Sequence, residues 1–275
     1  MGLIEAIVLG LVQGLTEFLP VSSSGHVLLA SELFGRDPGA GFTAVIQLGT
    51  LLAVLIYFWK DLVRAIGAWW RSLFDKAARG TNDARLGWAV FWGTFPVIVI
   101  GLLLEEQIDT AFRSPLLVAA MLIAVALVMW VAEVVSKRAR TLESVTVRDG
   151  WIVGLWQALA LVPGSSRSGS TIAGAMFLGM DRPTAARFSF LLSVPSVFAS
   201  GVYKLIKDRE VLLDEGLLET VAATLVAFAS GYAAIAFLIA YLQKRSTGVF
   251  IGYRLVLGGV IIALVLMGVV NVRTG

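Results

Sequence analysis

Two short polar stretches interrupt otherwise apolar sequence, and both hold residue types that can act on a phosphate group. The first, LTEFLPVSSSGH at residues 15–26, contains Glu17, three consecutive serines and the chain's only histidine, His26. The second, PGSSRSGST at residues 163–171, contains several hydroxyls and Arg167. A carboxylate can take a proton, a hydroxyl or imidazole can attack phosphorus, and a guanidinium can hold phosphate oxygens. We therefore expect the two stretches to form one site for an anion.

The carboxylate of the first stretch has an amide neighbour one helical turn before it. Gln13 and Glu17 are four residues apart, so they share a helix face. Since one member is an amide, and His26 is the only imidazole, the sequence predicts no tightly bound cofactor. A divalent cation, magnesium or calcium, can still bridge Glu17, with Gln13 beside it, to a substrate phosphate, because Mg²⁺ often binds through one carboxylate plus phosphates.

The serines of the first stretch precede a second short helix. Ser22, Ser23 or Ser24 can cap that helix by accepting from its free N–H groups, which is also their role if they take no part in chemistry. Ser23 and His26 are three apart and should project from one face. Gly25 allows close approach to the backbone.

The second stretch is typical of an anion-binding helix start. Free N–H groups at a helix N-terminus attract phosphate, and Arg167 adds a planar fork that matches phosphate oxygens. An arginine at that end faces the positive pole of the helix dipole, which is unfavourable unless an anion is present. The alternative is a structural ion pair between Arg167 and Glu17. We expect Ser165, Ser166 and Ser168 to add hydroxyl groups to the same site.

The composition indicates that these stretches belong to a membrane protein. Of 275 residues, 58% are hydrophobic and 15% are charged, and the mean hydropathy is +0.86. Soluble domains are nearer half apolar and a quarter charged. There is no cysteine, so disulfides and thiolate chemistry are excluded. The basic residues lie in short loops and form no continuous face, so we expect no nucleic-acid partner.

The apolar segments predict six membrane-spanning helices and two broken ones. A spanning helix needs about 20 mostly apolar residues. Two segments, 2–33 and 149–180, break at residues 20–25 and 163–169, and each half is too short to span. We interpret both as re-entrant helix–loop–helix hairpins, which membranes tolerate only where protein or a wet cavity surrounds the break. The full spans are expected at 41–59, 86–104, 115–135, 184–206, 217–242 and 249–271.

The two broken segments also resemble each other, which indicates an internal repeat. GLVQGLTEFLPVSSSG at residues 10–25 aligns with GLWQALALVPGSSRSG at 154–169, with Gln13 on Gln157. A one-residue gap then matches Pro20 with Pro163, and Ser22 and Ser23 with Ser165 and Ser166. We expect a single all-α membrane domain, 1–275, made of repeat 1–136 and repeat 148–275. Each repeat has a hairpin and three spans. Because three is an odd number of membrane crossings, the second repeat must be inverted relative to the first.

Loop charges predict the orientation. Cytoplasmic loops carry an excess of Lys and Arg. The loops after the first, third and fifth spans are the basic ones, with Lys60, Arg64, Arg71, Lys76, Arg79 and Arg85, then Lys137, Arg138, Arg140 and Arg148, then Lys244 and Arg245. The other loops are acidic or mixed, with Glu105, Glu106, Asp109 and Arg113, then Lys207, Asp208, Arg209, Glu210, Asp214, Glu215 and Glu219. The hairpins would then enter from opposite faces and meet near the midplane.

Three motifs resemble one known family, the bacterial undecaprenyl-diphosphate phosphatases linked to bacitracin resistance. They are QGLTEFLPVSSSGH at 13–26, PGSSRSGST at 163–171 and YR at 253–254. The resemblance covers the whole chain and implies a multi-pass hydrolase of the bacterial cytoplasmic (inner) membrane. It implies removal of the terminal phosphate of a C55 isoprenoid diphosphate, at a site open to the outer, periplasmic face. This reaction recycles the lipid carrier of peptidoglycan synthesis. The family's acidic motif is Glu or Gln, three residues, then Glu, and this chain has the Gln form.

The resemblance suggests a role for each reactive residue. Ser23 attacks or positions the terminal phosphorus, while Arg167 and the helix N-termini stabilise the developing charge. Glu17 acts as base or binds a divalent cation, Gln13 orients the diphosphate or its metal, and His26 protonates the leaving group or activates water. His26 as the phosphorylated nucleophile is the alternative. The remaining expected phosphate-binding residues are Ser22, Ser24, Gly25, Ser165, Ser166, Ser168 and Arg254.

Two questions stay open at the level of sequence. Arg254, early in the last span, can snorkel, pair or touch a ligand. Inverted repeats with broken helices are also a transporter architecture, so a transporter or flippase for an anionic solute or polyprenyl phosphate is the rival function. The expected partners are a polyprenyl diphosphate and membrane lipid, and a homodimer is allowed.

Overall fold

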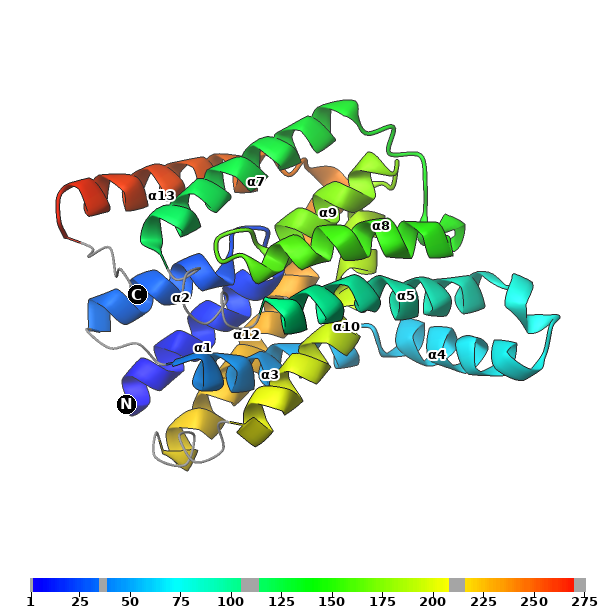
Figure 1. Ribbon diagram of the computed structural model, residues 1–275, viewed down its shortest axis with the longest axis horizontal. Coiled ribbons are helices and arrows are strands. Elements are labelled where there is room, and N and C mark those ends of the chain that lie inside the picture. Colours follow the sequence, from blue (N-terminus) through cyan, green and yellow to red (C-terminus); the bar gives the residue numbers. More distant parts are fainter. Residues whose placement is uncertain (1, 35–38, 105–113, 208–215, 270–275) are drawn as a thin grey trace.

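The structure is a computed structural model that describes residues 2–34, 39–104, 114–207 and 216–269, and these ranges are built from helices (Figure 1). The all-α prediction is therefore confirmed. In chain order the helices are α1 Leu3–Phe18, α2 Ser23–Phe34, α3 Gly39–Tyr57, α4 Trp59–Phe74, α5 Asn82–Leu103, α7 Pro115–Val135, α8 Val147–Ala158, α9 Arg167–Phe177, α10 Arg182–Lys207, α12 Leu217–Lys244 and α13 Gly248–Leu266, with 3-10 turns η1 Ala78–Gly80, η3 Leu142–Ser144 and η4 Leu159–Leu161.

Five of the six expected spans are single helices long and apolar enough to cross a membrane: α5, α7, α10, α12 and α13. The sixth, α3, meets that test together with α4, from which it is bent by 81°. The protein is thus a multi-pass membrane protein with five or six candidate spans in the described residues. Residues 105–106, 109 and 113, and most of the acidic loop 207–219, lie outside the described ranges, so their part in the orientation stays a prediction.

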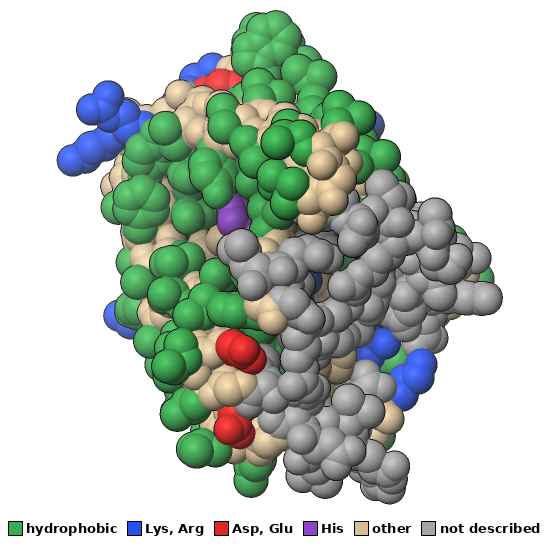
Figure 2. Space-filling view, turned by 90° about the vertical axis from the view of Figure 1, so that its left-hand side faces the viewer, with side chains coloured by type: hydrophobic (Ala, Val, Ile, Leu, Met, Phe, Trp, Pro, Cys, Tyr) green, Lys and Arg blue, Asp and Glu red, His purple; other side chains and the backbone are tan. Residues whose placement is uncertain are grey.

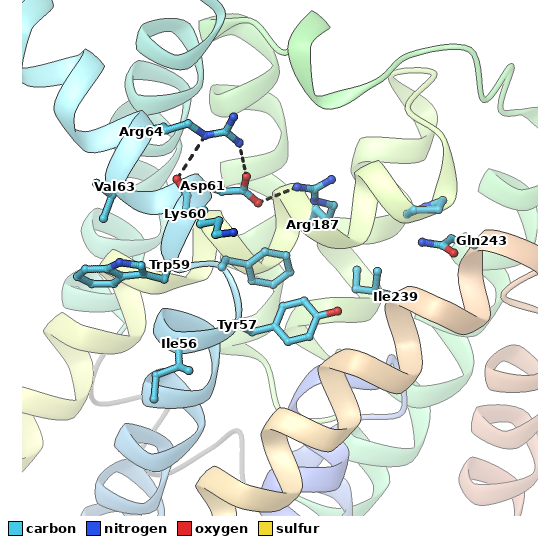
Figure 3. Close-up of a pocket in the computed structure, with 12 residues that line it drawn as sticks. Ile56, Tyr57, Trp59, Lys60, Asp61, Val63, Arg64, Arg187, Ile239 and Gln243 are labelled. Atoms are coloured by element: carbon cyan, nitrogen blue, oxygen red, sulfur yellow. Dashed lines mark hydrogen bonds and ion pairs between the residues drawn. The ribbon is translucent and has the colours of Figure 1, made fainter.

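Helix α4 corrects the sequence analysis, which treated residues 60–85 as a basic loop. Its Leu62, Ala65 and Ala68 are buried, while its Lys and Arg side chains are exposed, so it is an amphipathic helix packed along α5. Asp61 holds the bend. Its carboxylate accepts from Arg64 at 2.7 Å and from Arg187 of α10 at 2.7 Å, beside a cavity of about 1010 Å³ (Figure 3).

Both broken segments are pairs of packed helices, α1 with α2 and α8 with α9. Helix α1 packs along α12, and α8 packs along α5, as Figure 1 shows for the second pair. Glycine makes both contacts close. A Cβ added at Gly10 would lie 2.3 Å from the Ala223 oxygen, and one added at Gly154 would lie 2.2 Å from the Gly93 oxygen. Small residues at such places let helix backbones approach in a membrane, where apolar burial drives association weakly.

An ion pair ties the α7–α8 connection to the end of α9. Arg140 donates to both carboxylate oxygens of Asp149, at 3.0 and 2.6 Å, and to the Leu178 carbonyl. Thr146, the N-cap of α8, donates to the same carboxylate. Burial alone raises the pKa of Asp149, but the hydrogen bonds from Arg140 and Thr146 outweigh it and hold that pKa below its ordinary value of 3.8.

Gly154→Ala is expected to destabilise the protein by about 1–3 kcal/mol, because the added methyl meets backbone and the helices must shift. Gly259→Ala in α13 is the matched control, since nothing lies within 4 Å of a Cβ there. Alanine favours helix over glycine, so the control should be neutral or stabilising. Thermal unfolding in detergent measures both, and equal midpoints for the two variants would contradict the close packing of α8 on α5.

Asp149→Asn is expected to lower stability at pH 7 by about 1.5–3 kcal/mol, the range for hydrogen bonds to charged groups. The native pKa of Asp149 is lowered, so its contribution is present above 3.8 and is lost as pH falls through the lower native value. The difference between the midpoints of the two proteins, measured from pH 7 to pH 3, should therefore shrink as the pH falls below 3.8. A constant difference across that range would argue against the ion pair.

Candidate active site

Glu17, at the end of α1, is the centre of one polar cluster. Its Oε2 accepts from Gln13 Nε2 at 2.8 Å and from Ser23 Oγ at 2.8 Å. Its Oε1 lies 3.6 Å from Arg167 Nη2, and the side chains of Glu17 and Arg167 are 6% and 23% exposed. The structure therefore brings together three of the four predicted catalytic residues, and it contains the Glu17–Arg167 ion pair that the sequence analysis gave as the structural alternative.

Each break ends in a serine that caps the following helix with strained backbone. Ser22 has φ 76° and its Oγ accepts from Gly25 N at 3.4 Å, while Ser166 has φ 67° and its Oγ accepts from Gly169 N at 3.1 Å. Both hydroxyls also contact the serine two residues on, at 3.1 Å. Positive φ is rare outside glycine and costs of order 1–3 kcal/mol. Such strain persists where surrounding contacts impose it, as at functional sites.

The matching caps correct the repeat alignment. Ser22 corresponds to Ser166, not to Ser165, so the one-residue gap is wrong and one offset, 144 residues, relates the two stretches throughout. The Ser165 hydroxyl donates to the Val162 carbonyl within its own turn, so in this structure it is engaged in the turn. The gap had aligned Pro20 with Pro163, but cap geometry decides the register, because it fixes where each helix starts.

The two breaks contact each other directly. Ser24 Oγ accepts from Gly164 N at 3.0 Å, and Ser168 Oγ donates to the Leu19 carbonyl at 3.1 Å. Each contact joins a serine of one short helix to the backbone of the other break. These two predicted phosphate-binding serines therefore also hold the breaks together.

Arg254 of α13 is fully buried behind this junction. Its guanidinium donates to carbonyls of both breaks, Pro20 at 3.4 Å and Gly164 and Ser165 at 3.0 Å each. It also donates to the carbonyls of Met121 and Leu122 in α7. In this structure Arg254 therefore braces backbone, and its guanidinium hydrogen bonds within the described residues all go to backbone carbonyls. Of the three roles left open, pairing within the protein fits these contacts.

His26 lies in a second cluster next to the first. Its Nδ1 is 2.7 Å from the Ser22 carbonyl, and its Nε2 is 2.5 Å from the hydroxyl of Tyr253, whose ring stacks on the imidazole. The carbonyl can only accept, so Nδ1 carries a proton and Nε2 of the neutral ring accepts from Tyr253. No hydrogen bond in the described ranges joins His26 to Glu17, Ser23 or Arg167. Figure 2 shows the histidine at the surface among hydrophobic side chains.

Tyr253 is a site residue that the sequence analysis did not assign. Its hydroxyl fixes the ring nitrogen of His26 that faces away from the backbone, and the side chain is 44% exposed. The available signal was its place in the YR motif. Gly25 is buried, and a Cβ there would meet Val118, Ser22 and Leu122 at 3.5–3.7 Å, so its site role stays a prediction.

The described residues contain no cluster of three or more His, Cys, Asp or Glu that would hold a metal ion. At the site, both oxygens of Glu17 already face donors, and Gln13 presents its Nε2 toward Glu17. This donor set does not fit a resident metal cage, which for Ca²⁺ takes six to eight oxygen ligands. It does not conflict with an ion carried mainly by substrate phosphates.

Comparison with known proteins gives a consistent result. The chain matches the family described as bacitracin resistance protein BacA over residues 6–260. Similar proteins named undecaprenyl-diphosphatase come from Micrococcus luteus, 50% identical over 273 residues, and Chloroherpeton thalassium, 50% identical over 278. A third, from Myxococcus xanthus, is 49% identical over 276. The matches cover 98%, 98% and 100% of this chain and 99%, 98% and 93% of the relatives.

Ser166→Ala is expected to cost more stability than Ser166→Gly. Alanine removes the cap and keeps the strained φ, whereas glycine removes the cap but relieves the strain, a difference of about 1–2 kcal/mol. Chemical denaturation in detergent compares the two variants. If alanine were as stable as glycine, the positive φ at Ser166 would be excluded.

Proposed function

The chain belongs to the bacitracin resistance protein BacA family, and we propose that it is an undecaprenyl-diphosphatase. This membrane hydrolase converts undecaprenyl diphosphate to undecaprenyl phosphate and inorganic phosphate. In doing so it recycles the lipid carrier for cell-wall synthesis and confers bacitracin resistance. The observation that carries the assignment of the site is the junction of Glu17, Ser23 and Arg167 where two broken helices meet.

The terminal phosphate binds at the start of α9. Arg167, the first residue of α9, supplies a fork of N–H donors, and the helix N-terminus adds free backbone N–H groups and the positive end of its dipole. The guanidinium is partly exposed, and its ion-pair partner among the described residues is Glu17, at 3.6 Å. This long contact leaves N–H groups for phosphate oxygens. Charge that develops on those oxygens in the transition state is stabilised by the same donors.

Ser23 is the proposed nucleophile, because its hydroxyl already donates to Glu17 at 2.8 Å. Ser23 Oγ bonds to the terminal phosphorus, its proton passes to Glu17, and the bond from phosphorus to the bridging oxygen breaks. Undecaprenyl phosphate leaves with that oxygen. Glu17 then loses that proton to the solvent and acts as base again. It takes a proton from water, which attacks the phosphoserine phosphorus, and it returns the proton to Ser23 Oγ as the phosphorus–Oγ bond breaks and inorganic phosphate is released. Gln13 holds the Glu17 carboxylate in position through its 2.8 Å bond.

His26 as the phosphorylated nucleophile is the second candidate. Its Nε2 is the nitrogen without a proton, but the Tyr253 hydroxyl occupies it. Attack through Nε2 would require Tyr253 to move, whereas Ser23 is already paired with a base. Under the Ser23 mechanism, His26 and Tyr253 together pass a proton to the leaving group, or His26 activates water by taking a proton from it.

A divalent cation, if the reaction uses one, arrives with the diphosphate. Magnesium or calcium would then be held by Glu17 and phosphate oxygens, with Gln13 alongside. No resident cofactor is proposed.

We also propose the orientation inferred from loop charge: the bacterial inner membrane, with the site open to the periplasmic face. The inverted repeat 1–136 and 148–275 and its re-entrant hairpins belong to this proposal. They are supported by the single 144-residue offset, by matched strained caps at Ser22 and Ser166, and by α1 on α12 mirroring α8 on α5. A transporter or flippase for an anionic lipid would use the same architecture, and it is the rival that an assay must separate.

Arg167→Ala is expected to lower kcat/KM for phosphate release from undecaprenyl diphosphate about 10²–10³-fold, the range for loss of one donor to a developing oxyanion. Arg64→Ala, whose side chain is 62% exposed on α4, is the control and should keep full activity. Detergent-purified protein is used, because release without vesicles excludes transport as the assay's readout. If Arg167→Ala released phosphate at the unmodified rate, the proposal that α9 binds the phosphate would be wrong.

Acid-quenched enzyme should carry phosphate on Ser23 and not on His26 when analysed by mass spectrometry under conditions that preserve phosphohistidine. Ser23→Ala should abolish the adduct, and His26→Gln should retain it while turnover falls. An adduct on His26 would reverse the order of the two candidates.

A further inference from the structure

One buried side chain lacks the hydrogen bonds that its chemistry calls for. Gln157, near the end of α8, is fully buried, and neither Oε1 nor Nε2 has a hydrogen-bond partner within the described ranges. An amide offers two donor N–H groups and an acceptor oxygen, and most buried polar atoms in native structures are paired. An unpaired buried amide lowers stability, so it calls for an explanation.

The repeat explains why Gln157 is unpaired. The 144-residue offset matches it with Gln13, whose Nε2 donates to Glu17 one turn later. The same offset puts Leu161 where the first repeat has Glu17. At the corresponding positions the second stretch has the same amide but an apolar side chain in place of the carboxylate partner.

Gln157 lines a pocket that also reaches the candidate active site. The cavity has a volume of about 430 Å³, within the roughly 300–1,000 Å³ of small-molecule sites, and Arg167 lies in its wall. Ser196 and Ser200 also line it, but both hydroxyls donate to carbonyls of their own helix, α10. Tyr203 and Lys204, near the end of α10, line it as well. Gln157 and Arg167 are the polar lining residues that belong to the two breaks, and Gln157 is the one whose polar atoms have no hydrogen-bond partner in the described ranges.

The rest of the pocket is mainly apolar and reaches the outside of the helix bundle. The side chains come from α5, η4 and α10, and two of them, Ile98 and Leu102, are 40% and 66% exposed. A wall that begins at an arginine and an amide and continues along exposed aliphatic side chains fits a ligand with an anionic head and a hydrocarbon tail. The apolar lining residues are Val97, Ile98, Leu102, Ala160, Leu161 and Ala199.

We propose that this pocket binds the junction of diphosphate and isoprenoid, and that Gln157 is a substrate-binding residue. Gln157 Nε2 donates to a diphosphate oxygen that Arg167 also contacts, and the first isoprene units lie against the α5–α10 wall. The N–H groups make this contact because an ionised diphosphate offers only acceptors. The inference rests on the proposed function, since it identifies how the same site holds its substrate.

Gln157→Leu tests the inference because it keeps a side chain of similar size and removes both polar atoms. Binding of farnesyl methylenediphosphonate, which cannot be hydrolysed at its phosphorus–carbon–phosphorus bridge, is measured by calorimetry in detergent. We expect Kd to rise about tenfold to a hundredfold while the unfolding midpoint stays equal or rises, as removal of an unpaired buried amide predicts. Gln243→Leu, exposed on α12, is the matched control and should change neither quantity.

A second variant tests whether the isoprenoid tail lies in this pocket. A Cβ at Gly101 would lie 3.6 Å from Leu161 in ordinary contact, so Gly101→Phe extends a ring into the pocket. It should weaken the farnesyl analogue at least tenfold and leave methylenediphosphonate itself unaffected. Gly259→Phe, on an open face of α13, is its control.

The outcomes separate this inference from the proposed function. Unchanged analogue binding by Gln157→Leu, or no binding by the unmodified protein, overturns the inference. If binding falls as expected but the unmodified protein releases no phosphate from undecaprenyl diphosphate, the pocket stands and the hydrolase assignment fails. If phosphate release depends on Arg167 while Gln157→Leu binds normally, the inference fails and the proposed function stands.

Discussion

A single buried guanidinium joins the two helix breaks, and the geometry of the site depends on it. Arg254 donates to the Pro20 carbonyl of one break and to the Gly164 and Ser165 carbonyls of the other. A broken helix leaves backbone groups without intrahelical partners, and in a membrane interior other protein groups must supply them. Arginine can do so for several carbonyls at once, because its five N–H donors are held in one plane. The buried arginine thus holds the turns of the two breaks next to each other.

The same backbone conformation, a helix-capping serine at positive φ, occurs in both breaks, but the side chains that follow it differ. Ser22 and Ser166 both cap a short helix at positive φ, but the next residue is Ser23 in one and Arg167 in the other. One break brings a carboxylate, a hydroxyl and an imidazole, and the other brings the cation. In the proposed mechanism the base and nucleophile come from one break and the phosphate-binding arginine from the other, so they can act together only when the two breaks pack. The second break also differs at position 161, where Leu161 stands at the place that corresponds to Glu17, and Gln157 has no carboxylate one turn after it.

The local sequence pattern predicted where most helices lie, but it misaligned the two breaks and missed helix α4. The six apolar stretches each correspond to a helix, and the breaks fall where proline, glycine and serine were expected. The register between the breaks was missed, since two prolines were aligned where the helix caps should have been. Helix α4 was missed because its charges suggested a loop, although its Leu62, Ala65 and Ala68 share one buried face. The prolines misled the alignment of the two breaks, and the charged residues hid the periodic apolar face of α4.

By itself the sequence determined the all-α membrane class, the two reactive stretches and the presence of Glu17 and Arg167 in them. These follow from hydropathy and from spacing within a helix, which act over a few residues. The tertiary structure decided that Arg254 braces backbone, that Tyr253 reaches His26 across 227 positions, and that Gln157 has no hydrogen-bond partner in the part of the chain that the structure describes. Each of these depends on which helices pack side by side and how closely. Contacts between distant helices are set by side-chain packing of the whole bundle, and local periodicity carries no information about it.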